Sequence, residues 1–176
     1  EKTVLAGGRL TEVKRIDLLI EQFAHIHERE PEWKLRILGE GEDRAKLEEQ
    51  ITKLGAGDYI MLTGRKNGDE VEREMLSASI FAMSSRSEGF PFVLMEAQSC
   101  GLPIIAYDVR VGPGAVVHDG EDGVLVPEGE RRQYEDKLCE LMDSPELREK
   151  MSANATTAIR EFSEEKVAGK SYEVIE

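Results

Sequence analysis

Two glutamates, Glu88 and Glu96, stand on either side of a short apolar segment, with seven residues between them. Pro91 suits the first turn of a helix, so Glu88 is expected in the preceding loop and Glu96 about five residues into the helix. Residues 92–95 are apolar nearly all round, which predicts a buried helix. Because a buried carboxylate is costly without partners, Glu96 is expected to accept hydrogen bonds, and the hydroxyl groups of a ligand are suitable partners.

The start of this helix adds a second kind of binding group beside Glu88. The first backbone N–H groups of a helix have no partner within it, and its N-terminal dipole end is positive, so the position favours an anion. Amides for phosphate and two carboxylates for hydroxyls together suggest a nucleotide-sugar. The spacing alone leaves another interpretation open, in which Glu88 only starts the helix and Glu96 is a salt-bridged core residue.

A second candidate cluster lies near the beginning of the chain. The first 16 residues hold four basic side chains against two acidic ones, and Arg9, Lys14 and Arg15 follow the glycine pair Gly7-Gly8. Arginine offers a forked donor and lysine a point charge, so two such cations at a strand end can neutralise a diphosphate. The segment matches neither the Walker nor the dinucleotide glycine pattern. The alternative for this segment is an ordinary solvated loop. For a further glycine segment, Gly39-Glu-Gly41, the alternative is a plain tight turn.

Strand and helix signals alternate along the chain, which predicts an α/β fold. The consecutive apolar residues of the strands indicate a Rossmann-like, doubly wound parallel sheet of about six strands with helices on both faces. Ligands bind at the carboxyl ends of such strands, where the glycine-containing segments and Glu88 fall. The expected strands are 3–6, 33–38, 59–62, 79–83, 103–106 and 123–126. One expected helix begins at Ile16, one follows a cap at Asp43, and one follows Pro91. The other expected helices are 70–76, 131–142, 145–162 and a further helix from Glu164 onward, and a single helical turn is expected near Val116.

Composition narrows the function classes. The 176 residues carry 23 Lys and Arg against 36 Asp and Glu, a net charge of −13, which argues against a nucleic-acid partner. Cys100 and Cys139 form no disulfide framework or metal spacing, so a reducing compartment is expected. No membrane-spanning run or signal peptide is visible. The chain opens almost directly into a strand, so we expect it to be a piece of a longer protein.

The motifs resemble those of one enzyme family. The segment from Glu88 to Ala97, followed by Cys100-Gly-Leu-Pro-Ile-Ile-Ala106, is similar to the E-x7-E signature of the retaining GT-B glycosyltransferases of family 4. The resemblance covers nearly the whole chain in order, although Arg15 replaces a residue that is usually small. The other matching segments are Gly8-Arg-Leu10 with Lys14, Ile37-Leu-Gly-Glu-Gly41, Leu62-Thr-Gly64 and the stretch from Asp119 to Val126.

This resemblance implies that residues 1–176 form the C-terminal, nucleotide-sugar-binding domain, without the N-terminal acceptor-binding domain. It implies catalytic roles for Arg9 and Lys14 on the donor diphosphate and for Glu88 on the transferred hexose. Glu96 would hold the ribose, and backbone from Gly64 to Lys66 the base. It implies no metal and no cofactor beyond the nucleotide-sugar co-substrate. The implied donor-binding residues are Gly8, Gly64, Arg65, Lys66, Gly89, Phe90, Pro91, Phe92, Val93, Leu94 and Glu96.

One departure from the family pattern points to a subset. The stretch from Tyr107 to Gly114 resembles enzymes that use UDP-sugars to build teichoic acids, capsules and other surface glycans. The expected function is therefore hexose transfer from a UDP-sugar to a surface-glycan, teichoic-acid or lipid-linked acceptor, in the cytoplasm and at the inner face of the membrane. The isolated domain is expected to be inactive. A related sugar epimerase and an inactive nucleotide-binding module are the alternatives. Arg110 either faces the cleft or lies on the surface, and His118 is expected to be structural.

Overall fold

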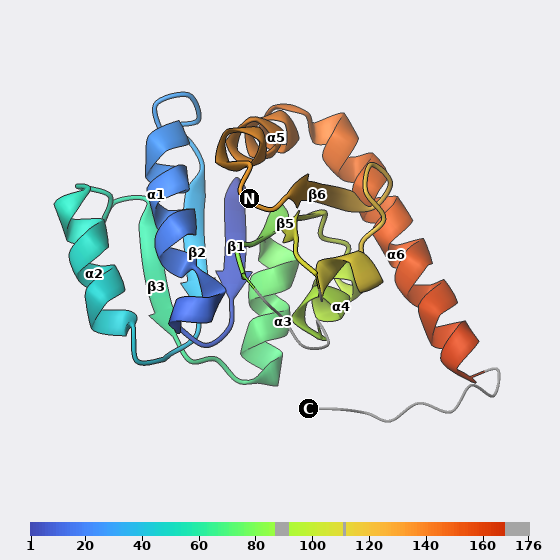
Figure 1. The fold of residues 1–176 in the computed structure, drawn as a ribbon. Coiled ribbons are helices and arrows are strands. Elements are labelled where there is room, and N and C mark those ends of the chain that lie inside the picture. Colours follow the sequence, from blue (N-terminus) through green and yellow to red (C-terminus); the bar gives the residue numbers. More distant parts are fainter. Residues whose placement is uncertain (87–91, 111, 168–176) are drawn as a thin grey trace.

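The computed structural model describes residues 1–86, 92–110 and 112–167. They contain a six-stranded parallel sheet with strand order β3-β2-β1-β4-β5-β6, which confirms the predicted Rossmann-like architecture (Figure 1). Strand order reverses between β1 and β4, so connections depart to either side from their carboxyl ends. The strands are β1 (Thr3–Gly7), β2 (Lys34–Leu38), β3 (Ile60–Gly64), β4 (Ile80–Met83), β5 (Ile104–Asp108) and β6 (Gly123–Pro127).

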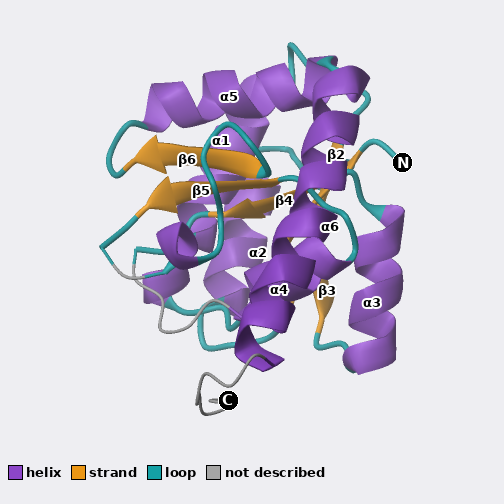
Figure 2. Ribbon diagram, turned by 90° about the vertical axis from the view of Figure 1, so that its right-hand side faces the viewer, coloured by secondary structure: helices purple, strands orange, loops and turns teal. Residues whose placement is uncertain are grey.

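Helices cover both faces of this sheet. Val4 and Ala6 of β1 pack in one buried cluster with α1, α2 and α5, whereas Leu5 points to the other cluster, with α3 and α4. Figure 2 shows α5 above β6 and α6 running past α4, and α6 contacts both helices. The helices are α1 (Ile16–Ile26), α2 (Arg44–Lys53), α3 (Gly68–Ser77), α4 (Phe92–Ser99), α5 (Arg131–Asp143) and α6 (Pro145–Val167), with short 3-10 turns η1 (Glu12–Lys14) and η2 (Pro113–Ala115).

The structure corrects several element boundaries. Helix α3 begins two residues before its predicted start because Asn67 forms a capping box with Glu70, through bonds of 2.9 and 3.0 Å. Asp43 precedes α2, but its side chain makes no capping hydrogen bond. The separate helix predicted from Glu164 is wrong, since α6 continues unbroken to Val167. The η1 turn was not predicted.

No helix within the described ranges combines the length and apolar character needed to cross a membrane.

Candidate functional site

The carboxyl ends of β1, β2 and β3 meet at a cluster of glycines. Gly8, Gly39 and Gly64 all have positive φ angles, of 132°, 130° and 86°. The Gly8 N–H donates to Leu38 O at 3.1 Å, and the Gly39 N–H donates to Gly64 O at 2.9 Å. A Cβ atom on Gly39 would lie only 2.0 Å from Gly8 O, so the close approach of the two loops requires glycine there.

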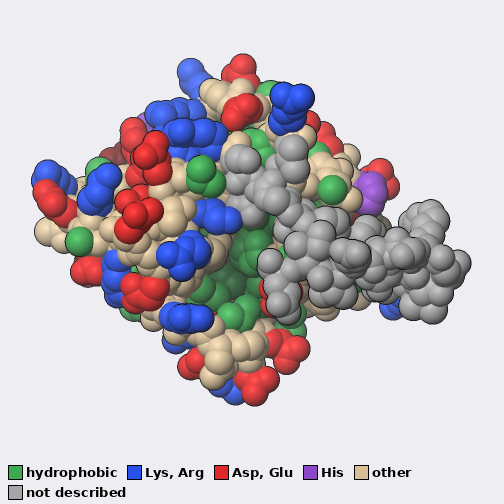
Figure 3. Space-filling view, turned by 60° about the horizontal axis from the view of Figure 1, so that its bottom comes forward, with side chains coloured by type: hydrophobic (Ala, Val, Ile, Leu, Met, Phe, Trp, Pro, Cys, Tyr) green, Lys and Arg blue, Asp and Glu red, His purple; other side chains and the backbone are tan. Residues whose placement is uncertain are grey.

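These strand ends form a cavity of about 440 Å³. Its size lies within the usual range of small-molecule sites. Figure 3, which brings the lower edge of Figure 1 forward, shows several Lys and Arg side chains, with Asp and Glu side chains among them, along one side of a hollow with hydrophobic side chains inside it. The cavity is lined by Gly8, Arg9, Leu38, Gly39, Glu40, Arg65, Lys66 and Val71. The structure therefore brings four of the predicted donor-site residues, from two separate loops, to one place.

Lys14 reaches the same region from the η1 turn. Its Cε and Nζ atoms lie 3.5 and 3.8 Å from the position that a Cβ would take on Gly8. Two contacts of the Lys14 backbone fix the turn: its N–H donates to Thr11 O at 3.1 Å, and its carbonyl accepts from Ser84 Oγ at 2.9 Å. Arg9 lies exposed at the other end of the loop and forms no side-chain hydrogen bond or ion pair with a described residue. The predicted cation pair thus lies beside Gly8.

Glu40 is a cavity residue that the sequence did not single out. Its carboxylate accepts a hydrogen bond from Arg44 Nη1 at 2.5 Å. Glu40 Oε2 and Arg44 Nη1 each lie 3.5 Å from the position that a Cβ would take on Gly64. The Gly39-Glu-Gly41 segment reads as a plain turn in sequence. The available signals were its place directly after a strand and the resemblance of Ile37-Leu-Gly-Glu-Gly41 to the family pattern.

Helix α4 is less buried than its composition predicts. Leu94, Ala97 and Gln98 are buried, but Phe92 and Val93 are only partly covered and Glu96 is exposed. The prediction of Glu96 as a buried carboxylate is therefore wrong, and no described side chain forms an ion pair with it. Among the described elements, α4 makes its main contacts with α6 and β5, and these contacts leave Glu96 exposed. Its apolar neighbours still raise the Glu96 pKa by partial desolvation.

Four predicted site residues, Glu88, Gly89, Phe90 and Pro91, lie outside the described residues. Their roles stay predictions. Two other residues considered from the sequence are described.

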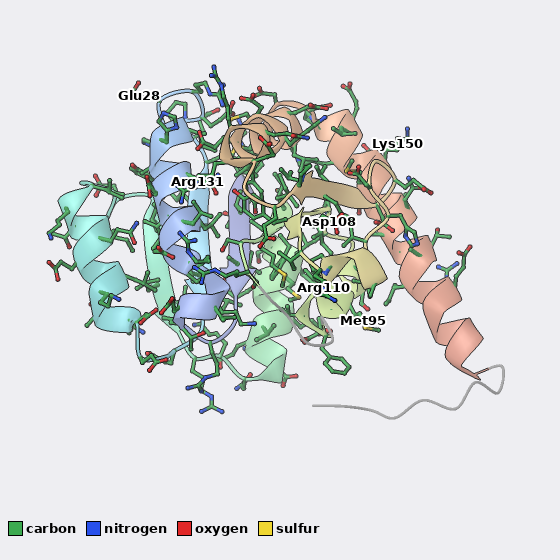
Figure 4. All side chains as sticks on the ribbon, in the orientation of Figure 1. Glu28, Met95, Asp108, Arg110, Arg131 and Lys150 are labelled. Carbon is green, nitrogen blue, oxygen red and sulfur yellow. The ribbon has the colours of Figure 1, made fainter. Side chains whose placement is uncertain are left out.

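Arg110 follows β5 and is exposed (Figure 4). His118 donates its backbone N–H to the buried carboxylate of Asp122 at 2.7 Å, and its Nδ1 lies 2.7 Å from that carboxylate, which raises the His118 pKa. This pairing fits the structural role expected for His118. Among the described residues, no group of three or more His, Cys, Asp and Glu side chains could hold a metal ion.

Comparison with known proteins identifies the family. Residues 1–158 match the model for glycosyl transferases group 1. The chain belongs to this family. It is 43% identical over 132 residues, 74% of its length, to the "UDP-N-acetylglucosamine--peptide N-acetylglucosaminyltransferase GtfA subunit" of Streptococcus parasanguinis, covering 26% of that protein. It is 30% identical over 175 residues, 99% of its length, to the "Amylovoran biosynthesis glycosyltransferase AmsD" of Erwinia amylovora, covering 48% of it.

Solved glycosyltransferase structures share the fold. A complex of a point mutant of S. aureus TarM with fondaparinux, alpha-GlcNAc-glycerol and UDP aligns with a TM-score of 0.87 at 25% identity, over 92% of this chain and 32% of that one. The pneumococcal O-GlcNAc transferase GtfA, in complex with UDP and GlcNAc, aligns with a TM-score of 0.84 at 30% identity, with the same coverage. The sheet is thus the one found in GT-B glycosyltransferase structures. The chain spans between a quarter and a half of the two curated relatives.

Proposed function

We propose that this chain is the donor-binding part of a retaining GT-B glycosyltransferase of family 4, which transfers a hexose from a UDP-sugar. The observation that carries this proposal is the cavity at the ends of β1, β2 and β3, where Arg9, Arg65 and Lys66 converge and Lys14 lies over Gly8. A uridine diphosphate is the preferred ligand because the 30% identical pneumococcal relative was solved with UDP and GlcNAc.

The cations suit the chemistry of the leaving group. When the bond between sugar and diphosphate breaks, negative charge develops on the diphosphate, and fixed positive groups lower the barrier. Arg9 supplies a forked donor and Lys14 a compact charge at that position. The first N–H groups of α4, at Phe92, Val93 and Leu94, supply further donors for phosphate. These groups take the place of a divalent metal in the proposed mechanism.

The remaining donor contacts follow from the same arrangement. The loop from Gly64 to Lys66 borders the cavity beside Val71, so an aromatic base would lie between apolar and cationic walls. Glu96 is proposed to accept hydrogen bonds from the ribose and Glu88 from the hexose. The transfer retains the anomeric configuration on one face of the sugar and uses no covalent enzyme intermediate.

The acceptor is proposed to be a surface glycan, a teichoic acid or a lipid-linked glycan at the inner face of the membrane. Two relatives support a glycan acceptor: AmsD is named for amylovoran biosynthesis, and TarM was solved with alpha-GlcNAc-glycerol. Acceptor specificity is assigned mainly to a part of the full-length protein other than this donor domain.

The two glutamates allow a direct test of the donor assignment. If Glu96 holds the ribose, Glu96→Gln weakens UDP and UDP-GlcNAc alike, by roughly 1.5–3 kcal/mol for one charge-assisted hydrogen bond. If Glu88 holds the hexose, Glu88→Gln leaves UDP affinity nearly unchanged and lowers kcat in the full-length enzyme. Calorimetry with both ligands, alongside melting curves, measures these effects.

A third variant, Glu149→Gln, serves as the control because Glu149 is an exposed carboxylate on α6, away from the cavity residues. It should change neither affinity. The assignment is wrong if the Glu88 and Glu96 variants lower only the melting temperature and bind both ligands like the control.

A further inference from the structure

A second, smaller cavity lies on the other side of the η1 turn from the proposed donor site. Its volume is about 170 Å³, and it opens between the carboxyl ends of β4, β5 and β6 and the starts of α1 and α5. Three arginines line it, together with two buried serines and a buried tyrosine: Arg15, Arg86, Arg131, Ser84, Ser85 and Tyr107. Three guanidinium groups in one small cavity are unusual in a chain of net charge −13.

The backbone of Arg15 directs its side chain to this cavity. Its φ and ψ angles are 50° and 41°, and it is the only non-glycine residue with positive φ in the described ranges. This left-handed conformation is unfavourable for arginine, and strained residues of this kind concentrate at functional sites. The side chains of Lys14 and Arg15 therefore lie at different cavities. Lys14 lies over Gly8 in the donor site, whereas Arg15 lines the second cavity.

Arg131 is held at the opposite wall by a buried network. Gln22 Nε2 donates to the Arg131 carbonyl at 3.0 Å and lies 3.0 Å from the hydroxyl of Tyr107, which in turn donates to Gln22 Oε1 at 3.2 Å. The Tyr107 pKa is raised, chiefly by burial and also by the charge of Glu135, while the hydrogen bond with Gln22 and the charges of Arg131 and Arg15 oppose the shift. Both guanidinium groups are therefore close enough to act on this hydroxyl.

The carboxylates nearby leave donors on the arginines available. Asp17 accepts from Arg15 Nε at 3.1 Å and Nη2 at 3.4 Å, so Arg15 Nη1 is not used in that pair. Glu12 lies 3.8 Å from Arg86 and is 85% exposed, so water weakens its attraction. Glu128 also lines the cavity, and Arg131 forms no ion pair with a described residue.

We propose that this cavity binds one phosphate or carboxylate group of an acidic glycan acceptor, next to the donor site. The inference rests on the proposed function for the identity of the glycan, but the site itself is built from residues the donor does not use. Its volume lies below the range of about 300–1,000 Å³ typical of whole-ligand pockets, which suits a single charged group. Guanidinium forks match phosphate and carboxylate oxygens in geometry as well as charge.

The test is a titration of the chain with inorganic phosphate and, separately, with glucuronate, followed by NMR of the arginine Nε–H resonances. Arg131→Gln should weaken binding of the preferred anion about fivefold or more, as expected for losing a charge-assisted contact. The matched control is Arg132→Gln, because Arg132 is the next residue on α5 and does not line this cavity. A preference for phosphate indicates a phosphorylated glycan, and a preference for glucuronate indicates a uronic acid.

Arg15→Gly provides a variant that is expected to fold at least as well as the parent, because glycine accepts the left-handed conformation. It should raise the melting temperature and still weaken anion binding. Repeating the titration with saturating UDP separates the two sites, since anion binding should persist. The proposal is wrong if UDP displaces the anion, if Arg131→Gln and Arg132→Gln behave alike, or if neither anion binds. Failure of UDP alone to bind would instead contradict the proposed donor function.

Discussion

Gly39 lies where the loops after β1 and β2 approach most closely, and its conformation leaves no room for a side chain. We predict that Gly39→Ala destabilises the chain by about 2 kcal/mol or more, because both the left-handed backbone and the contact with Gly8 O are unfavourable. It should also weaken UDP binding by displacing Arg9. Urea unfolding and calorimetry measure the two effects.

Gly55→Ala is the control for backbone strain alone. Gly55 also has a positive φ, of 65°, but a Cβ there would meet nothing within 4 Å. The cost should be about 1–2 kcal/mol, with UDP affinity unchanged. Equal losses of stability in the two variants would show that the contact between the loops contributes nothing.

The sequence predicted which residues gather at the cavity better than it predicted their burial. Gly8, Arg9, Arg65 and Lys66 were placed together because parallel strands bring their carboxyl ends to one edge. The exposure of Glu96 was missed, because apolar residues around a helix show what it could bury but not how many sides its neighbours cover.

At the level of elements, alternating strands and helices were predictable because buried parallel strands and amphipathic helices have distinct patterns. The ends of the helices and turns were less predictable where hydrogen bonds from a capping side chain or from a distant loop determine them. The capping box of Asn67 and Glu70 starts α3 early, and the η1 turn depends on contacts with Ser84 and Arg86 from the loop after β4. The hydrogen bond between Ser84 and Lys14 joins residues 70 positions apart in the chain, so no local sequence pattern predicts it.

The loop after α1 and the end of α5 are joined by a carboxyl pair that responds to pH. Burial, then a hydrogen bond to Asp143 and its charge, raises the pKa of Glu30 from 4.5 to about 7, while Arg29 and Lys2 oppose the shift. The folded chain therefore keeps a proton that the unfolded chain loses. The stability from this proton is complete below about pH 4.5 and is lost as the pH rises through about 7.

We predict that Glu30→Gln removes this dependence, since glutamine can donate to Asp143 at any pH. Relative to the parent chain, the variant should gain roughly 1–3 kcal/mol of stability between pH 5 and pH 8. Denaturant unfolding at both pH values measures the difference. Glu32→Gln is the control, because Glu32 pairs with Lys2 at the surface. Parallel stability curves for the parent chain and Glu30→Gln would contradict the assignment.

In this acidic chain of net charge −13, Lys and Arg side chains line both cavities at the carboxyl edge of the sheet, and Figure 3 shows several of them on that face. We predict that UDP binding needs no divalent metal, because the proposed function assigns the charge of the diphosphate to Arg9, Lys14 and the start of α4. The dissociation constant should agree within about twofold in EDTA and in manganese, a difference below about 0.5 kcal/mol. Binding that disappears with EDTA and returns with manganese would show that the cations do not suffice.

The last prediction concerns the chain by itself. It should bind UDP only weakly, by about 4–6 kcal/mol, because the donor cavity lies at the edge of the sheet, where water competes for the diphosphate. It should transfer no sugar, since transfer requires exclusion of water and a bound acceptor, and this chain spans only 26–48% of the two curated relatives. Release of UDP from UDP-GlcNAc measures turnover, with Arg9→Gln as the background. Release above that background, at a rate that rises with added acceptor, would show that one domain suffices for catalysis.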